Sequence, residues 1–315
     1  MANAHKKFFS KIGFNYLILG VAAIIFQIIF LTAIVPVYPQ VLSNMTLLSI
    51  ISSICVYVFP FPIFYWLMKK IKTSKIEKKS LSARQFLEYA CITITLMWIG
   101  NITGLIITAL IGSFMQSTVV NPVQELINNT HIMFNILVIS IIGPIFEEVI
   151  FRKMLIDRTI KYGARVSIIL SAVLFALFHG NLNQFFYAFL MGAFFAYVYV
   201  KTGNIIYSIM LHFIINMFGS VISIIVGTAM INMESGIMLG DVLIIILYLL
   251  ILLVSFVVGL YKLFNYKKSK FNGEKTEIQL EKPYQTMFLN AGMILFIAFY
   301  IYEIISQLGI VPFIF

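Results

Sequence analysis

Nine long apolar runs constrain this chain more than any other feature of its sequence. They cover approximately residues 13–36, 46–68, 85–112, 132–153, 166–181, 184–200, 204–229, 241–261 and 286–303. A helix needs about 20 apolar residues to cross the hydrocarbon core of a bilayer. Because 61% of the residues are hydrophobic and only 11% are charged, lipid must surround most of the chain. We therefore predict an all-α, polytopic membrane helix bundle of about nine spans.

Two of these runs leave the number of spans open. The fifth and sixth runs are short, and only residues 180–183 separate them. They are compatible with a hairpin that does not fully cross the membrane, in which case eight spans are possible. Cys55 and Cys91 lie inside apolar runs and are expected to be packing residues.

The positive charges predict the orientation of the bundle. All 22 lysines and arginines precede the first run or lie where the second, fourth, sixth and eighth runs end. Cationic connections stay on the cytoplasmic side, so we expect a cytoplasmic N-terminus and an external C-terminus. Membrane topology thereby accounts for the net charge of +10. The expected partner of this surface is the lipid bilayer, and no nucleic acid is needed to explain it.

Ionisable residues within membrane spans are unfavourable and are usually functional, and this chain has few of them. Glu147 and Glu148 lie near the end of the fourth run, four to five residues before Arg152. His179 ends the fifth run, and His212 lies within the seventh. The i, i+4 spacing predicts that Glu148 pairs with Arg152 on one helix face, which leaves Glu147 without that partner.

Helical spacing also predicts that these side chains meet. Glu147 and His179 are each 16 residues from Gly163, where the fourth and fifth spans could turn, so they should face each other. His212 and Asn216 share one stripe of the seventh span. With Arg152 taken as the cytoplasmic boundary, Glu147 lies about 7.5 Å inside it. The sequence thus predicts one shallow site on the cytoplasmic side.

Two kinds of chemistry suit this set of residues. A carboxylate beside an imidazole can deprotonate a water molecule, and a second imidazole and an amide can stabilise the oxyanion of a tetrahedral intermediate. Alternatively, Glu147, His179 and His212 could bind zinc with water as the fourth ligand. Tyr197 and the other aromatic residues of the spans are expected to be packing or interface groups.

Three motifs occur in order on separate spans and resemble those of the CPBP family, which contains the CAAX prenyl endopeptidases and the bacteriocin-processing and immunity proteins. The motifs are Glu147-Glu148-x-x-x-Arg152, Phe175-x-x-x-His179 and His212-x-x-x-Asn216. The resemblance covers about residues 130–225. It implies three membrane regions: N-terminal spans with a basic cytoplasmic loop in 1–129, a catalytic helix core in 130–229, and C-terminal spans in 230–315.

The resemblance also implies roles for the motif residues. Glu147 would be the general base, His179 would assist it, and His212 and Asn216 would form the oxyanion hole. Glu148 and Arg152 would orient the site. The family has been described both as glutamate proteases and as metalloproteases. We favour the form without a cofactor, because asparagine is a poor zinc ligand and a natural hydrogen-bond donor.

The leading hypothesis is an intramembrane endopeptidase that cleaves a membrane-associated peptide or protein near the cytoplasmic face. Lysine, isoleucine and asparagine are abundant, which favours a bacterial plasma membrane. The resemblance then favours peptide pheromones, bacteriocin precursors or signalling proteins as substrates. One rival is a non-enzymatic scaffold that regulates a membrane signalling partner. Another is a proton-coupled transporter, although the chain lacks the repeated halves that are typical of transporters.

Overall fold

The structure is a computed structural model that describes residues 2–236, 238–265 and 277–311. All regular secondary structure in these ranges is helical. Four lysines of the last predicted basic cluster, Lys267, Lys268, Lys270 and Lys275, lie outside the described residues.

Fifteen α-helices form within the described ranges, and short π and 3-10 segments join several of them into longer continuous helices. The α-helices are α1 (Ala2–Ile34), α2 (Met45–Ser53), α3 (Pro60–Lys69), α4 (Ala83–Met115), α5 (Pro122–Asn129), α6 (Ile132–Phe134), α7 (Gly143–Glu148), α8 (Leu155–Thr159), α9 (Ala164–Phe178), α10 (Leu182–Thr202), α11 (Ile205–Asn216), α12 (Ser223–Ser235), α13 (Leu239–Phe264), α14 (Pro283–Phe288) and α15 (Ala291–Gln307). The π segments are η2 (Ile54–Val58), η3 (Asn135–Ile142), η4 (Val149–Met154) and η6 (Met217–Ile222), and the 3-10 segments are η1 (Pro39–Leu42) and η5 (Ile160–Tyr162).

Each predicted run corresponds to a helix or to a continuous series of helical segments. In the described part of the chain, seven of these units are long and apolar enough to cross a membrane. The other two, α9 and α15, have 15 and 17 residues and are shorter than a typical span. The fold class is therefore confirmed as an all-α polytopic membrane bundle, whereas nine crossings remain a prediction.

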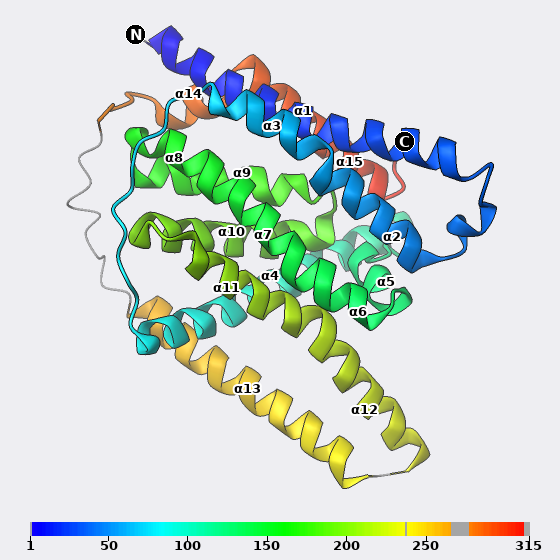
Figure 1. Ribbon diagram of the computed structural model, residues 1–315. Coiled ribbons are helices and arrows are strands. Elements are labelled where there is room, and N and C mark those ends of the chain that lie inside the picture. The colour runs from blue at the N-terminus through cyan, green and yellow to red at the C-terminus, as the bar shows by residue number, and fades with distance from the viewer. Residues whose placement is uncertain (1, 237, 266–276, 312–315) are drawn as a thin grey trace.

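The helices run back and forth between two ends of the bundle (Figure 1). The N-terminus, α8 and α14 lie at one end, together with the start of α4, whereas α5 and the turn between α12 and α13 lie toward the other. The described segments that carry predicted basic clusters, such as α8 and the start of α4, lie at the first end. The structure thus agrees with the alternation expected from the sequence, and the cytoplasmic assignment of this end remains a prediction.

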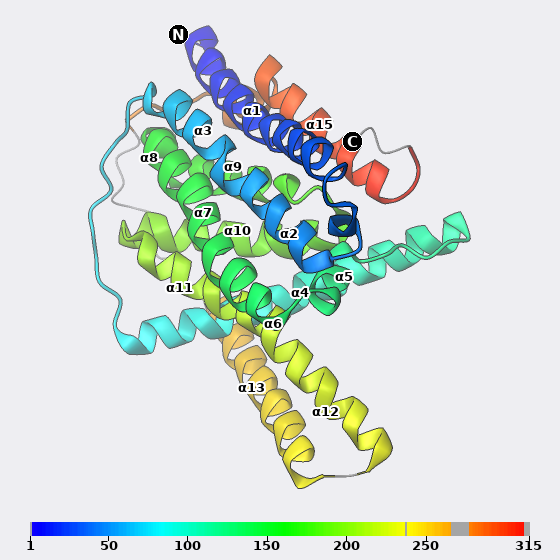
Figure 2. The ribbon, with the colours of Figure 1, turned by 45° about the vertical axis from the view of Figure 1, so that its right-hand side comes forward.

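Helices α9 and α10 form an antiparallel hairpin near the centre of the bundle (Figures 1 and 2). On one side, α15 contacts α9, and α1 packs against α15 and α3. On the other side, α4 packs on α10, and α13 packs on α4. Together with α13, α12 extends away from the rest of the bundle (Figure 2).

Two glycines bring α4 and α10 into close contact. A Cβ atom on Gly100 would collide with the backbone of Tyr187, and one on Gly104 would lie 2.8 Å from the carbonyl oxygen of Asn183. Small residues four positions apart let membrane helices approach closely. This Gly-x-x-x-Gly contact fixes the position of the first turns of α10, which carry part of the candidate site.

Candidate active site

Glu147 lies on α7 between a phenol and an imidazole. The Tyr57 hydroxyl donates to Glu147 Oε1 at 2.6 Å, and Glu147 Oε2 lies 3.6 Å from His212 Nε2. The Tyr57 ring also stacks on Phe146, with centroids 5.5 Å apart. One carboxylate oxygen is therefore fixed by a hydrogen bond, and the other faces the imidazole.

Glu148 and Arg152 form the expected i, i+4 ion pair, and both side chains are completely buried. Arg152 Nε lies 3.1 Å from Glu148 Oε2, and the guanidinium carbon lies 4.3 Å from the centre of the Phe175 ring. The other oxygen of Glu148 lies 2.9 Å from His212 Nδ1. Since a carboxylate can only accept, His212 carries a hydrogen on Nδ1 and directs Nε2 toward Glu147.

His179 follows directly after α9. Its Nδ1 lies 2.8 Å from the carbonyl oxygen of Phe175, and the two rings meet edge to face with centroids 4.7 Å apart. The carbonyl can only accept, so the hydrogen is on Nδ1. In the neutral ring, Nε2 is then the acceptor.

The position of Asn216 depends on a proline in another helix. The Gly143 N–H bonds to Val138 O, five residues earlier, in the π pattern of η3. Pro144 has no N–H with which to continue this pattern to Ile139. Instead, Asn216 Nδ2 donates to Ile139 O at 2.8 Å. This bond ties α11 to the segment that precedes Glu147 and uses one of the two amide hydrogens of Asn216.

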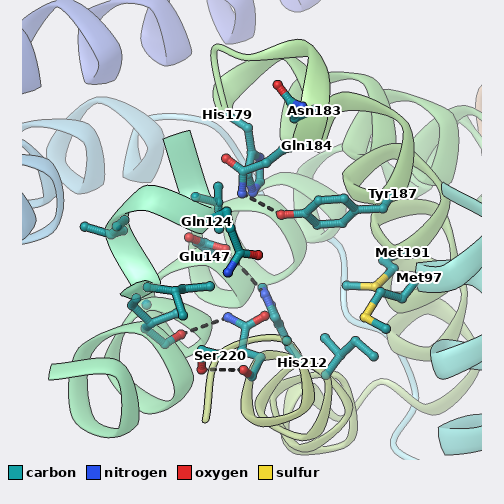
Figure 3. A pocket seen from close by; sticks show the side chains of 18 of the residues that line it. Met97, Gln124, Glu147, His179, Asn183, Gln184, Tyr187, Met191, His212 and Ser220 are labelled. Carbon is teal, nitrogen blue, oxygen red and sulfur yellow. Dashed lines mark hydrogen bonds and ion pairs between the residues drawn. The ribbon is translucent and has the colours of Figure 1, made fainter. Parts of the chain in front are cut away.

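These groups share one cavity of about 360 Å³. Four predicted residues line it: Glu147, His179, His212 and Asn216. The ion pair of Glu148 and Arg152 lies behind this wall, outside the lining. Figure 3 shows Glu147, His179 and His212 around the same space, with Tyr187 entering from α10. The structure thus brings together the predicted side chains from three separate spans.

The predicted depth of the site needs a correction. The sequence predicts the cytoplasmic boundary at Arg152, but this residue is fully buried and the helical segment continues to Tyr162. Ten further residues correspond to about 15 Å of helix. Part of the cavity wall also comes from α5, which lies toward the end opposite the basic clusters (Figure 1). The site is therefore considerably deeper, measured from the basic end, than the sequence suggested.

Sequence reasoning also missed two tyrosines by treating span aromatics as packing groups. Tyr57 and Tyr187 both line the cavity, and Tyr57 contacts Glu147 directly. An isolated tyrosine in an apolar span carries no sequence signal for such a role. For Tyr187, the Gly100-x-x-x-Gly104 pattern on α4 was an available clue to close packing of its helix.

The zinc alternative was tested on the arrangement of the donors. Within the described ranges, no group of three or more histidine, cysteine, aspartate or glutamate side chains is placed to hold a metal ion. Glu147, His179 and His212 therefore do not form a ligand set in this geometry, and we derive no reaction step through a metal.

Comparisons with known proteins find similarity to membrane peptidases. Residues 129–218 match the model of the type II CAAX prenyl endopeptidase Rce1-like family. A segment of 87 residues is 37% identical to the protein named "Putative membrane peptidase YdiL" of Bacillus subtilis (strain 168). That match covers 26% of this chain and about a third (34%) of the relative. No solved structure matches the chain.

The family match covers the central part of the chain and contains all the motif residues gathered at the cavity or directly behind it. Residues 129–218 are therefore similar to the type II CAAX prenyl endopeptidase Rce1-like family, and the chain spans about a third of the length of the curated relative that it matches.

Proposed function

We propose that this protein is an intramembrane endopeptidase that hydrolyses a peptide bond within the cavity, with Glu147 as the general base. The observation that carries this proposal is the arrangement of Glu147 itself. One carboxylate oxygen is held by Tyr57 at 2.6 Å, and the other faces a cavity shared with His179, His212 and Asn216. A fixed carboxylate with one oxygen directed into a cavity is suited to remove a proton from water.

The reaction follows from the hydrogen positions. Water that binds beside Glu147 gives a proton to its carboxylate, and the resulting hydroxide attacks the scissile carbonyl carbon. His179 assists by accepting a hydrogen bond from the same water through Nε2, because its Nδ1 hydrogen is bonded to Phe175 O. When the tetrahedral intermediate collapses, the C–N bond breaks and Glu147 returns the proton to the departing amine.

The negative charge on the carbonyl oxygen requires hydrogen-bond donors during this step. His212 can supply one when Nε2 also carries a hydrogen, with Glu148 holding the ring through Nδ1. Asn216 supplies the second through the amide hydrogen that Ile139 does not use. Glu148 and Arg152 act as positioning residues, because their buried ion pair fixes the His212 ring from behind.

We further propose that the substrate is a membrane-associated peptide or protein of a bacterial plasma membrane. No lysine or arginine is among the described residues that line the cavity, so a free carboxylate would find no permanently cationic side chain there. This favours an internal peptide bond over one at a free C-terminus. The depth of the cavity weighs against the expectation that the cut lies near the cytoplasmic face.

The test uses purified protein in liposomes and a library of quenched fluorescent peptides. We expect wild type to cleave at least one peptide, and Glu147→Ala and His179→Ala to abolish that cleavage while retaining the fold. Glu234→Ala, which removes an exposed carboxylate at the end of α12, is the matched control and should keep full activity. Cleavage that persists in Glu147→Ala would refute the proposal.

A parallel arm tests metal dependence with a zinc chelator. Cleavage that is unchanged by the chelator supports the glutamate mechanism, and cleavage restored only by added zinc would refute it. The scaffold hypothesis predicts a different result in cells. If the protein is a scaffold, Glu147→Ala should complement a deletion strain as well as wild type does. Loss of complementation in that variant would support the hydrolase.

A further inference from the structure

The orientation of Asn181, in the turn between α9 and α10, is determined by a backbone group. The Gln184 N–H lies 2.9 Å from the side-chain oxygen of Asn181. A backbone N–H can only donate, so the atom that faces it must be Oδ1. The amide nitrogen of Asn181 then donates to His179 O at 2.8 Å and to Gln184 Oε1 at 2.6 Å.

The orientation of Gln184 follows from that of Asn181. Its Oε1 accepts from Asn181, so its Nε2 is the atom 2.5 Å from the Tyr187 hydroxyl oxygen. An amide nitrogen can only donate, and Tyr187 is therefore the acceptor in this bond. The phenolic hydrogen of Tyr187 is not used there, and no other hydrogen bond of this hydroxyl occurs among the described residues.

The Tyr187 hydroxyl is directed into the candidate site. Its side chain lines the cavity from α10, and in Figure 3 the hydroxyl lies beside Gln184 on the side of the ring that faces His179 and Glu147. The close contact of Gly100 with the Tyr187 backbone fixes this turn of α10 against α4. A donor fixed in this way is preorganised, because its orientation does not have to change during the reaction.

We propose that Tyr187 is a catalytic residue that donates its hydroxyl hydrogen bond to the scissile carbonyl oxygen of the substrate. This inference rests on the proposed function. The other candidate donors are partly committed, since both nitrogens of His212 face carboxylates and Asn216 shares its amide with Ile139. Tyr187 adds a hydrogen for which the described residues provide no acceptor. The hydrogen bond strengthens as the carbonyl oxygen becomes an oxyanion, and it involves no transfer of the phenolic proton.

The test measures kcat and KM with a peptide that wild type cleaves and Glu147→Ala does not. Loss of one oxyanion donor typically lowers kcat about 100- to 1000-fold, and we expect Tyr187→Phe to do so with KM changed less than about threefold. Tyr65→Phe is the matched control, because Tyr65 is exposed on α3 and does not line the cavity. It should retain wild-type kinetics. Circular dichroism and gel filtration verify that both variants are folded.

A second variant separates donation from a structural role. Gln184→Glu keeps the oxygen that accepts from Asn181 and replaces the amide nitrogen with an oxygen that accepts from Tyr187. The phenolic hydrogen should then turn away from the cavity, so kcat should fall as far as in Tyr187→Phe. The double variant should fall no further. If the hydroxyl only stabilised the fold, Gln184→Glu, Tyr187→Phe and the double variant would not lower kcat to the same level.

Two failures are distinguishable. If wild type cleaves a peptide that Glu147→Ala does not, and Tyr187→Phe retains kcat within about threefold, the role of Tyr187 is refuted while the proposed function stands. If Tyr187→Phe raised KM and left kcat unchanged, the role of Tyr187 would also be refuted. If wild type cleaves no peptide in excess of Glu147→Ala, the proposed function fails and this inference fails with it.

Discussion

Removing one member of the buried pair formed by Glu148 and Arg152 should destabilise the whole protein. Both side chains are completely buried, and Arg152 Nε lies 3.1 Å from Glu148 Oε2. We consider Arg152→Met, which retains much of the volume and removes the charge, and Glu148→Gln, which retains the shape. Each leaves one buried charge without its ionic partner.

The magnitude follows from this burial. Breaking a buried ion pair by removing one partner typically lowers the free energy of unfolding by about 3–5 kcal/mol. That change reduces the ratio of folded to unfolded protein by roughly a hundredfold to several thousandfold. Arg152→Met should lie toward the lower end, because Glu148 keeps its hydrogen bond from His212 Nδ1. Glu148→Gln should lie toward the upper end, because the guanidinium is then faced by the aromatic rings of Phe175 and Phe195 without its carboxylate partner.

Equilibrium unfolding in mixed micelles with increasing SDS, followed by circular dichroism, measures both variants. The double variant Glu148→Gln/Arg152→Met tests the cause, since it leaves no buried charge at the pair and should recover most of the lost stability. It should remain inactive, because His212 loses the carboxylate that holds its Nδ1. Single variants within about 0.5 kcal/mol of wild type, or effects that simply add in the double variant, would refute this reasoning.

Three further predictions follow from the site and its supports. Tyr57→Phe should lower kcat about 10- to 100-fold without altering the melting temperature, because a charge-assisted hydrogen bond to the proposed base is lost; unchanged kinetics would contradict this role. Gly100→Leu should lower both the melting temperature and the activity by displacing Tyr187, whereas Gly227→Leu, which has open space around it, should change neither. In a variant without native cysteines, Gln124→Cys on exposed α5 should react with a membrane-impermeant maleimide added outside intact cells; labelling only after lysis would reverse the predicted topology.

Much of the fold could be predicted because lipid imposes simple rules on the chain. A span must be long, apolar and helical, so the runs at 13–36 and 241–261 identify α1 and α13 directly. The hairpin expected around residues 180–183 is also present, with Asn181 capping the first turn of α10. In the site, the i, i+4 rule predicted the pair of Glu148 and Arg152, because it depends on one helix alone.

The depth of the site could not be obtained in the same way. Counting residues from Arg152 assumed that a charged side chain marks the membrane boundary, which holds only where the charge reaches water. Here the compensation comes from protein instead, through Glu148 on the same helical segment and the Phe175 ring of α9. Whether an arginine is compensated by water or by protein depends on packing between distant segments. A single sequence does not reveal this packing, and it conceals the contact of Tyr57 with Glu147 for the same reason.

Different segments of the chain supply the proposed hydrolytic groups and the remaining wall of the cavity. The family match ends at residues 129 and 218 and contains all the motif residues. Tyr57, Met97, Asn101 and Gln124, however, come from α4, α5 and η2, which precede the matched segment. These side chains form the part of the cavity that lies beyond the proposed hydrolytic groups. A relative that shares only the central segment can therefore share the reaction and still bind a different peptide, because its remaining wall is built from unrelated residues. Exchanging α5 between two such proteins should accordingly alter which peptides are cleaved and leave the dependence on Glu147 unchanged.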